Sequence, residues 1–364
     1  MLKSLSLRKL LPMLLAATLL ASCAGNADSD ASKAATTTVP AVSEPDTSII
    51  SDRPAYEPSA DALAKYVLTN PNAGETTKKI YAYLGEMTDK GVLSAQQEST
   101  WMGSADYEMD YIFDKTGKYP AIRGLDYMSD DFDGVNERAL KWWNEGGLVT
   151  ICWHTGFDFN GEWNQAMKTE ITDWDAVLTD GTPENVAFLA GMDKAAQALL
   201  KLQEQGVTVL WRPFHEFDGA WFWWGKGGSE NFKKLWQLMY DRYTNHWGLN
   251  NLIWVLGYSG NGNNYDQWYP GDAYCDVLGA DSYNGGAQER LCDLVKSVTT
   301  ANKPLCFHEC GTNPTVDQLK GTHWVWFMTW HTDFVTNKNT PDAFKALYNS
   351  DYVITKDELP DFRS

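Results

Sequence analysis

Eight short apolar segments, separated by longer segments of helical character, run through most of this 364-residue chain. Each is hydrophobic almost throughout, as is typical of parallel strands that are covered on both faces. The pattern favours an α/β fold, and the number of strands predicts a single (β/α)8 TIM barrel. The predicted strands are Val92–Ala95, Ala121–Leu125, Leu148–Trp153, Thr208–Arg212, Leu252–Leu256, Val277–Ala280, Pro304–Phe307 and Trp324–Thr329.

The segments between the strands contain signals for helix ends. No GxGxxG motif follows a predicted strand, so the main alternative, a doubly wound open sheet, is less favoured. Structureless connections as long as Thr155–Gly181 are uncommon, so we predict that this segment is a functional loop. We expect helices that begin at capping side chains, with Thr182 for a helix to Gln205, Ser229 for one to His246 and Asp133 for one to Glu145.

Polar and aromatic side chains follow five of the predicted strands at the point where each strand ends. In barrels of this type, reactive residues lie at the carboxyl ends of the strands. The sequence therefore predicts that these side chains surround a common site at one end of the barrel. They are His154, His215, Glu216, Asp281, Ser282, Tyr283, His308, Glu309, Trp330 and His331.

The segment Trp211–Gly225, WRPFHEFDGAWFWWG, contains four tryptophans and sets Glu216 beside Arg212 and His215. Burying a charge beside apolar rings is costly unless a partner or a proton compensates for it. Indole faces pack on the C–H faces of sugar rings, and the polar side chains can hydrogen-bond sugar hydroxyls. The segment thus favours a carbohydrate-active site over an aromatic core segment with one paired glutamate.

Glu216 and Glu309 follow the fourth and seventh strands, on opposite sides of the predicted barrel mouth. Glycoside hydrolysis needs two carboxyl groups that flank the bond, and a separation of ~5–5.5 Å permits a nucleophile and an acid. Apolar neighbours would raise the pKa of the acid, and hydrogen-bond donors would keep the nucleophile ionised. The residues best placed for these tasks are Phe214, Phe217 and Trp221 for the acid, and Arg212 and Tyr283 for the nucleophile.

Other functions fit parts of this pattern. Each glutamate, taken singly, also fits a salt-bridged residue at the rim. The two His-Glu pairs begin like HExxH, but the fifth positions are Gly219 and Thr312, so we expect no metal and no cofactor. A lipoprotein that binds glycans without cleaving them would explain the tryptophans but not the two glutamates.

The strand-4 segment resembles the signature of glycoside hydrolase family 26, mostly retaining β-mannanases on a (β/α)8 barrel. Shorter similarities cover roughly residues 80 to 335. Two features depart from the family pattern, Cys310 after Glu309 and the Thr155–Gly181 loop. The matching segments are Arg212–Gly225, Ser94–Glu98, Gly124–Tyr127, Trp153–His154, Gly279–Tyr283, Glu309–Gly311 and Phe327–His331.

The resemblance implies a role for individual residues. Glu216 would be the acid/base and Glu309 the nucleophile, to which Tyr283 would donate a hydrogen bond. The remaining residues would bind the substrate, with His154, Arg212, His215 and Trp330 around the −1 sugar and Trp221 stacking in the +1 direction.

The resemblance also implies the substrate class. It favours an endo-acting mannan endo-1,4-β-mannosidase that cleaves mannan, glucomannan or galactomannan. Relatives in the family that act on β-1,3-xylan or mixed-linkage β-glucan, and exo-acting mannobiohydrolases, stay open as alternatives.

The amino terminus is typical of an export signal. Three basic residues precede the apolar run Leu10–Leu20, which is short for a membrane span, and Leu20–Cys23 resembles a bacterial lipobox. We predict a lipoprotein signal peptide over 1–22, lipidation of Cys23, a flexible tether over 23–55 and a catalytic domain over 56–364. The protein would be lipid-anchored to a bacterial outer membrane, on its cell-surface or periplasmic face.

The chain is strongly acidic. Removing residues 1–22 takes away three positive charges and changes the formal net charge from −18 to −21. Such a surface repels nucleic acid and anionic lipid headgroups and suits a neutral polysaccharide partner. We expect a monomer.

Five cysteines remain beyond Cys23, an odd number that cannot all pair within the chain. Cys152 and Cys306 lie in apolar runs and are expected to be buried thiols. A disulfide between Cys275 and Cys292 stays open, because sequence cannot settle it.

Overall fold

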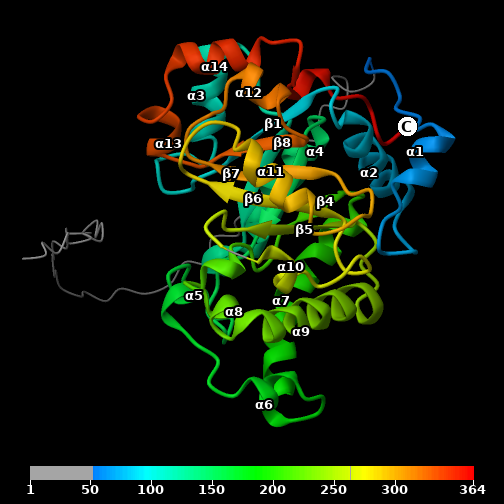
Figure 1. Ribbon diagram of the computed structural model, residues 1–364, viewed down its shortest axis with the longest axis vertical. Helices are drawn as coiled ribbons and strands as arrows, with labels where there is room; N and C mark the ends of the chain where they lie inside the picture. Colours follow the sequence, from blue (N-terminus) through cyan, green and yellow to red (C-terminus); the bar gives the residue numbers. More distant parts are fainter. Residues whose placement is uncertain (1–51, 263) are drawn as a thin grey trace, which may run out of the picture. The chain divides into compact units, whose positions relative to one another are not determined.

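A closed barrel of parallel strands forms the centre of the protein in the computed structural model, which describes residues 52–262 and 264–364 (Figure 1). Neighbouring strands pair in chain order, and β8 pairs back with β1, so the predicted (β/α)8 barrel is confirmed. The barrel strands are β1 Val92–Gln97, β2 Ile122–Asp126, β3 Leu148–Cys152, β4 Val209–Trp211, β5 Leu252–Tyr258, β6 Val277–Ser282, β7 Leu305–Cys310 and β8 Trp324–Thr329.

A further strand, β9 (Val353–Ile354), pairs with the beginning of β1 at Val92 and Leu93. Two barrel neighbours already flank β1. The extra pairing is accommodated because β2 bonds only the later part of β1, from Ala95 to Gln97. The carboxyl-terminal segment thereby closes against the amino-terminal end of the barrel.

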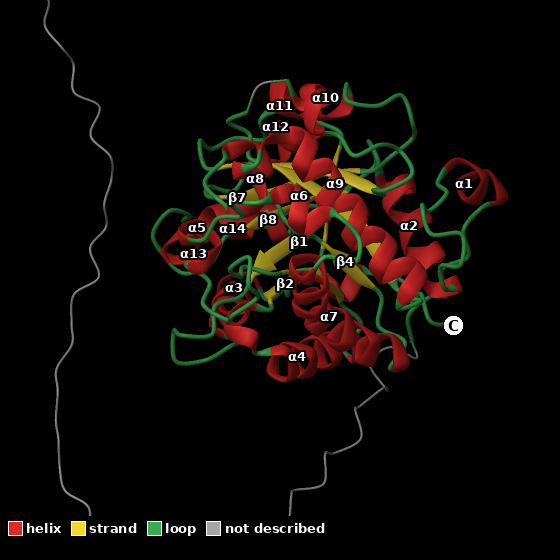
Figure 2. Ribbon diagram, turned by 90° about the horizontal axis from the view of Figure 1, so that it is seen from below, coloured by secondary structure: helices red, strands yellow, loops and turns green. Residues whose placement is uncertain are grey.

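Helices surround the strands, as Figure 2 shows in red around yellow. The strands are buried on both faces because the helices cover the outside of the barrel and side chains fill its inside. The helices are α1 Ala60–Lys65, α2 Glu75–Met87, α3 Tyr107–Thr116, α4 Phe132–Asn144, α5 Gln165–Lys168, α6 Trp174–Leu178, α7 Pro183–Glu204, α8 Trp223–Lys226, α9 Gly228–Asp241, α10 Tyr265–Trp268, α11 Glu289–Lys296, α12 Val316–Lys320, α13 Asp333–Thr336 and α14 Pro341–Tyr348.

The three helices predicted from capping signals are present. Thr182 caps α7 as expected, and its Oγ1 accepts a hydrogen bond from the Asn185 N–H at 3.1 Å. The other two begin two residues earlier than predicted, because Gly227 and Asp131 occupy the cap positions in place of Ser229 and Asp133. The second helix was expected to continue to His246. In the structure α9 ends at Asp241, and a π-helical turn over Arg242–His246 follows it.

All five cysteines of the described residues are buried free thiols, so the open disulfide is absent. Cys275 lies before β6 and Cys292 on α11, and each sulfur has a different neighbour. The Cys275 Sγ contacts the carbonyl oxygen of Gly271 at 3.8 Å, and the Cys292 Sγ accepts a hydrogen bond from the His323 N–H at 3.3 Å.

The predicted signal peptide and Cys23 lie outside the described residues, as does nearly all of the predicted tether. Within residues 52–262 and 264–364, every helix is too short or too polar to cross a membrane.

Replacement of Leu199 by alanine tests the packing of α7 on the barrel. Leu199 is fully buried on the inner face of this helix, so the variant should lose about 2–5 kcal/mol of unfolding free energy. Val186 lies on the same helix but is 58% exposed, and Val186→Ala should change it by less than about 0.5 kcal/mol. Urea denaturation measures both, and equal losses would contradict the assigned packing face.

Candidate active site

A cavity of about 800 Å³ opens at the carboxyl ends of the barrel strands. Its lining comes from the segments after β1, β2, β3, β4, β6, β7 and β8, as the sequence predicts for a barrel site. Six of the predicted catalytic and substrate-binding residues line it together, namely His154, His215, Glu216, Tyr283, Glu309 and Trp330. Arg212 and Trp221 do not line it, but each bonds one of the two glutamates.

A tight turn after β4 positions Glu216. Phe214 and Glu216 both have left-handed backbone conformations, with φ of 51° and 54°, which are unfavourable for residues other than glycine. The Glu216 N–H donates to the carbonyl oxygen of Gly257 on β5 at 2.7 Å. The turn is therefore fixed to the neighbouring strand, and its strain is concentrated at the predicted acid.

The tryptophans of the Trp211–Gly225 segment have different tasks from those that their sequence suggests. Trp211, Trp223 and Trp224 are completely buried and pack in the core, so they are not sugar-stacking surfaces. Trp224 Nε1 donates to the carbonyl oxygen of His215 at 2.7 Å and supports the strained turn. Only Trp221 is partly exposed, because the other indole rings fill the space between the barrel and the helices after it.

Glu216 has the electrostatics of a general acid. Burial raises the pKa of its carboxyl group to about 8, and the nearby charge of Glu309 adds to the increase. Trp221 Nε1 donates to Glu216 Oε2 at 2.9 Å and opposes this increase by stabilising the charged form. Glu216 is therefore mostly protonated at neutral pH and can deliver a proton. The predicted walls Phe214 and Phe217 are buried in the core, and Phe222 lines the cavity instead.

Glu309 lies at the end of β7 within a set of donors. Arg212 Nη1 donates to its Oε1 at 2.6 Å, and the Tyr283 hydroxyl donates to its Oε2 at 2.9 Å. His215 Nε2 lies 3.5 Å from Oε1. Gln97 holds the arginine from the other side, because its Oε1 accepts from Arg212 Nη2 at 2.7 Å. These bonds stabilise an ionised carboxylate and fix its direction.

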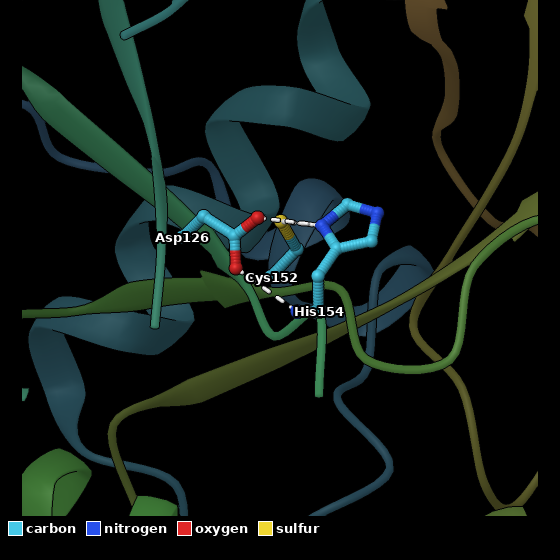
Figure 3. Close-up of side chains that lie close together, drawn as sticks. All are labelled: Asp126, Cys152 and His154. Atoms are coloured by element: carbon cyan, nitrogen blue, oxygen red, sulfur yellow. Dashed lines mark hydrogen bonds and ion pairs between the residues drawn. The ribbon is translucent and has the colours of Figure 1, made fainter. Parts of the chain in front are cut away.

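His154, Asp126 and Cys152 lie close enough together to be considered as a metal site (Figure 3). The His154 Nδ1 and Asp126 Oδ2 atoms are instead bonded directly at 2.5 Å, and Asp126 Oδ1 accepts from the His154 and Met128 N–H groups. Burial raises the pKa of the Cys152 thiol well above its usual range, so the free thiol stays protonated. The cluster is thus a hydrogen-bonded support that orients His154 toward the cavity.

The contact between Asp126 and His154 also influences the pKa values of two histidines, His154 and His215. Burial alone would lower the pKa of His154, but the charge and hydrogen bond of Asp126 outweigh it and raise that pKa. The His215 ring packs edge-on against His154, with 4.7 Å between centroids. Burial, followed by the charges of His154 and Arg212, lowers the pKa of His215 well below its usual range, so His215 is neutral.

Asp281 and His308 lie beneath the cavity rather than on its rim, which the sequence did not reveal. Both are buried, and Asp281 Oδ1 lies 2.5 Å from His308 Nδ1. Burial, followed by the charges of Glu309 and Glu216, raises the pKa of Asp281 well above its usual range. Burial also lowers the pKa of His308. Both groups therefore favour their neutral forms, which limits the negative charge below the two glutamates.

Comparison with known proteins decides the family. The model of glycosyl hydrolase family 26 matches residues 69–358. The chain belongs to this family. The family assignment made from the segments around Glu216 and Glu309 is therefore confirmed, and the match extends beyond the 80–335 region in which those segments were found.

Relatives within family 26 include a mannan endo-1,4-β-mannosidase of Thermothelomyces thermophilus. It is 35% identical over 80% of this chain, and the chain spans 63% of its length. A ruminal GH26 endo-β-1,4-mannanase structure superposes with a TM-score of 0.75 at 31% identity, over 84% of this chain and 72% of that one. A β-mannanase from a symbiotic protist of the termite Reticulitermes speratus, complexed with a gluco-manno-oligosaccharide, gives 0.75 at 29% identity, over 81% and 98%.

Sequence reasoning missed the part of the site contributed by β1, β2 and the Thr155–Gly181 loop. Trp101, Arg138 and Trp163 line the cavity there. Arg138 Nε donates to Glu98 Oε1 at 2.8 Å, so its charge is paired within the protein. The Trp163 side chain could have been anticipated from the functional loop, but nothing local in the sequence places Trp101 or Arg138 beside it.

Replacement of Trp221 by phenylalanine tests the acid through its pH dependence. In the wild type, kcat/KM for a β-linked oligosaccharide should fall as the pH rises through about 8, because Glu216 loses its proton. The variant lacks the indole N–H that stabilises the Glu216 carboxylate, so the pKa of Glu216 should rise further. The alkaline limb of the kcat/KM profile should therefore move to higher pH. Trp247→Phe removes an indole bond to Asp193 elsewhere and should leave the limb in place. A shift of the Trp221 variant to lower pH would contradict the assignment.

Proposed function

We propose that the protein is an endo-acting β-1,4-mannanase that cleaves mannan, glucomannan or galactomannan with retention of configuration. One observation carries the proposal, the contrast between the two glutamates in one cavity. Glu309 accepts hydrogen bonds from two donors, Arg212 and Tyr283, and the raised pKa of Glu216 keeps a proton on that residue. Such a pair divides the tasks of nucleophile and acid as glycoside hydrolysis requires.

In the first step, an oxygen of Glu309 attacks the anomeric carbon and the glycosidic C–O bond breaks. Glu216 transfers its proton to the departing oxygen, and a covalent glycosyl-enzyme forms. The Arg212 and Tyr283 donors keep the attacking carboxylate directed at the cavity. Neutral His215, next to Glu309, can hydrogen-bond a sugar hydroxyl without an added charge.

In the second step, Glu216, now ionised, takes a proton from a water molecule. The water oxygen attacks the same anomeric carbon as this proton is transferred, and the bond to Glu309 breaks, which returns Glu309 as a carboxylate and leaves Glu216 protonated for the next cycle. Two displacements at one carbon give net retention. No step in this scheme needs a metal or a cofactor.

The choice of mannan and of endo action is supported by the relatives, most of which are mannan endo-1,4-β-mannosidases. One weaker match, 26% identical over 44% of this chain, is an endoglucanase. Mixed-linkage β-glucan and β-1,3-xylan are therefore the substrates to compare with mannan.

Substitution of each glutamate by alanine separates the two roles. Glu216→Ala should reduce mannan turnover by roughly 10²–10⁴-fold, and Glu309→Ala by at least as much. An aryl β-mannoside with a dinitrophenolate leaving group needs no proton. Glu216→Ala should therefore still release dinitrophenolate in a first burst, whereas Glu309→Ala should not.

Reducing-end and dinitrophenolate assays measure these effects. Glu230→Ala removes an exposed carboxylate of α9 and should match the wild type. If both active-site variants cleave mannan at wild-type rates, or if Glu309→Ala alone gives the burst, the roles are wrong.

We also infer that Cys23 is lipidated and holds a monomeric enzyme at a bacterial outer membrane. The Leu20–Cys23 segment supports the anchor. A monomer is supported by the cavity, because one chain supplies both glutamates and all the donors described above.

Metabolic labelling with an alkyne fatty acid tests the anchor in an expressing bacterium. The full-length wild-type protein should take up the label. Cys23→Ala should not, since it lacks the thiol that receives the lipid. Cys292→Ala, which removes a buried thiol, should remain labelled. Persistence of the label in Cys23→Ala would contradict the inferred site.

A further inference from the structure

Strand β7 contains one residue more than its neighbours directly before Glu309. Ala280 of β6 pairs with Phe307, but the next residue of β6, Asp281, pairs with Glu309. The pairing of β7 with β8 also shifts register over this stretch. His308 is therefore an extra residue in β7. An extra residue of this kind bends a strand and changes the direction of its side chains.

The extra residue allows two successive side chains to face the inside of the barrel. In a regular strand, neighbouring side chains point to opposite faces. Here Glu309 lines the cavity, and the centroid of the preceding His308 ring lies 5.5 Å from that of His215. His308 is only 1% exposed and does not itself line the cavity. It therefore lies beneath the reacting groups, where it does not reach a substrate.

The His308 ring occupies the space that a side chain at Gly257 would need. Gly257 lies on β5, two strands away from β7 in the sheet order (Figure 1). A methyl group at Gly257 would lie 2.8–2.9 Å from three atoms of the ring, at which distance the atoms would overlap. The φ of Gly257 is not positive, so its backbone conformation does not require glycine. The close approach of the ring explains why this strand position has no side chain.

Asp281 fixes the orientation of this ring. Its Oδ1 lies 2.5 Å from His308 Nδ1, and both side chains are fully buried. The other ring nitrogen, Nε2, has no hydrogen-bond partner among the described residues. The ring therefore acts in the barrel interior through its bond to Asp281 and through its shape.

The end of β5 carries the turn that holds the proposed acid. The carbonyl oxygen of Gly257 accepts from the Glu216 N–H at 2.7 Å. Two residues further along both segments, the Ser259 N–H donates to Asp218 Oδ1 at 2.7 Å. The turn is thus bonded to β5 twice, and the position of Gly257 determines that of Glu216.

We infer that His308 is a positioning residue that sets the distance between Glu216 and Glu309. It directly precedes Glu309 in β7, and its ring packs on Gly257, which bonds the backbone of Glu216. The inference rests on the proposed function, because a reaction that uses both carboxyl groups depends on their separation. His308 acts through the barrel interior and is not a catalytic residue.

Replacement of His308 by asparagine tests this role with two leaving groups. Asparagine can keep a bond to Asp281 but leaves the space beside Gly257 unfilled. The acid should then be misplaced, and kcat on mannan should fall by roughly 10–100-fold. Release of dinitrophenolate from the aryl β-mannoside needs no proton, and Glu309 keeps its two donors. The rate of the dinitrophenolate burst should therefore stay close to that of the wild type, whereas a merely structural role would lower both rates together.

Gly257→Ala tests the contact itself, because its effect should reverse between two backgrounds. In the wild type, the methyl group would displace the His308 ring, and kcat on mannan should fall. In the His308→Asn variant, the methyl group fills the vacated space and should restore part of the lost kcat. Equal losses on the two substrates in His308→Asn, no loss on mannan, or a further loss on adding Gly257→Ala would overturn the positioning role.

His323→Asn is the matched control. His323 also bonds an aspartate through Nδ1, at 2.6 Å to Asp89 Oδ1, but it lies outside the cavity and is partly exposed. This variant should match the wild type on both substrates. Urea denaturation checks that each variant is folded, and His308→Gln, with a longer amide side chain, replaces His308→Asn if the latter is not.

Crystal structures separate this inference from the proposed function, because they need no turnover. In His308→Asn, the 2.7 Å bond from the Glu216 N–H to Gly257 should lengthen or break, and the separation of the Glu216 and Glu309 carboxyl groups should change. An unchanged bond and an unchanged separation would overturn the positioning role. Failure of the wild type to cleave both mannan and the aryl mannoside would instead overturn the proposed function, and the structures would still decide whether His308 positions the acid.

Discussion

The buried ion pair between Arg212 and Glu309 is the interaction on which the site depends. Two charges withdrawn from water are tolerated only when they are paired and their remaining hydrogen-bonding groups have partners. Gln97 and Tyr283 provide partners from β1 and from the end of β6, so the pair connects strands on opposite sides of the barrel. Removing the arginine would leave the carboxylate buried and uncompensated. The pairing therefore serves the stability of the barrel mouth and the direction of the proposed nucleophile together.

Around this pair, burial and neighbouring charges set the pKa values of carboxyl groups that come from different strands of the barrel. The charge of Glu309 disfavours ionisation of Glu216 and of Asp281, and burial acts in the same direction. Glu309 differs from the other two carboxyl groups because its donors differ from theirs. Glu309 has an arginine, Glu216 only an indole N–H, and Asp281 a histidine whose pKa is itself lowered by burial. Glu216 and Asp281 therefore both favour their protonated forms beside the ion-paired Glu309.

The strained turn after β4 illustrates how packing supports chemistry. Left-handed conformations at Phe214 and Glu216 cost free energy, which the surrounding bonds offset. Trp224 contributes by bonding the carbonyl oxygen of His215, and Gly225 allows close approach of the Phe217 carbonyl oxygen. Trp221 and Trp224 thus help to hold Glu216 in place, and the more exposed tryptophans of the cavity, Trp101 and Trp163, come from other segments. Composition alone does not distinguish these tasks.

The sequence by itself determined the barrel, the strand order and the meeting of Glu216 and Glu309 in one cavity, because these follow from local patterns. Apolar runs predict strands, and parallel strands bring residues that follow them to one end. Only the tertiary structure decided which rings are exposed, that Asp281 and His308 lie below the rim, and that Trp101 and Trp163 line one cleft. These properties depend on contacts between segments far apart in the chain, such as Glu108 with Thr332, and no local pattern contains them.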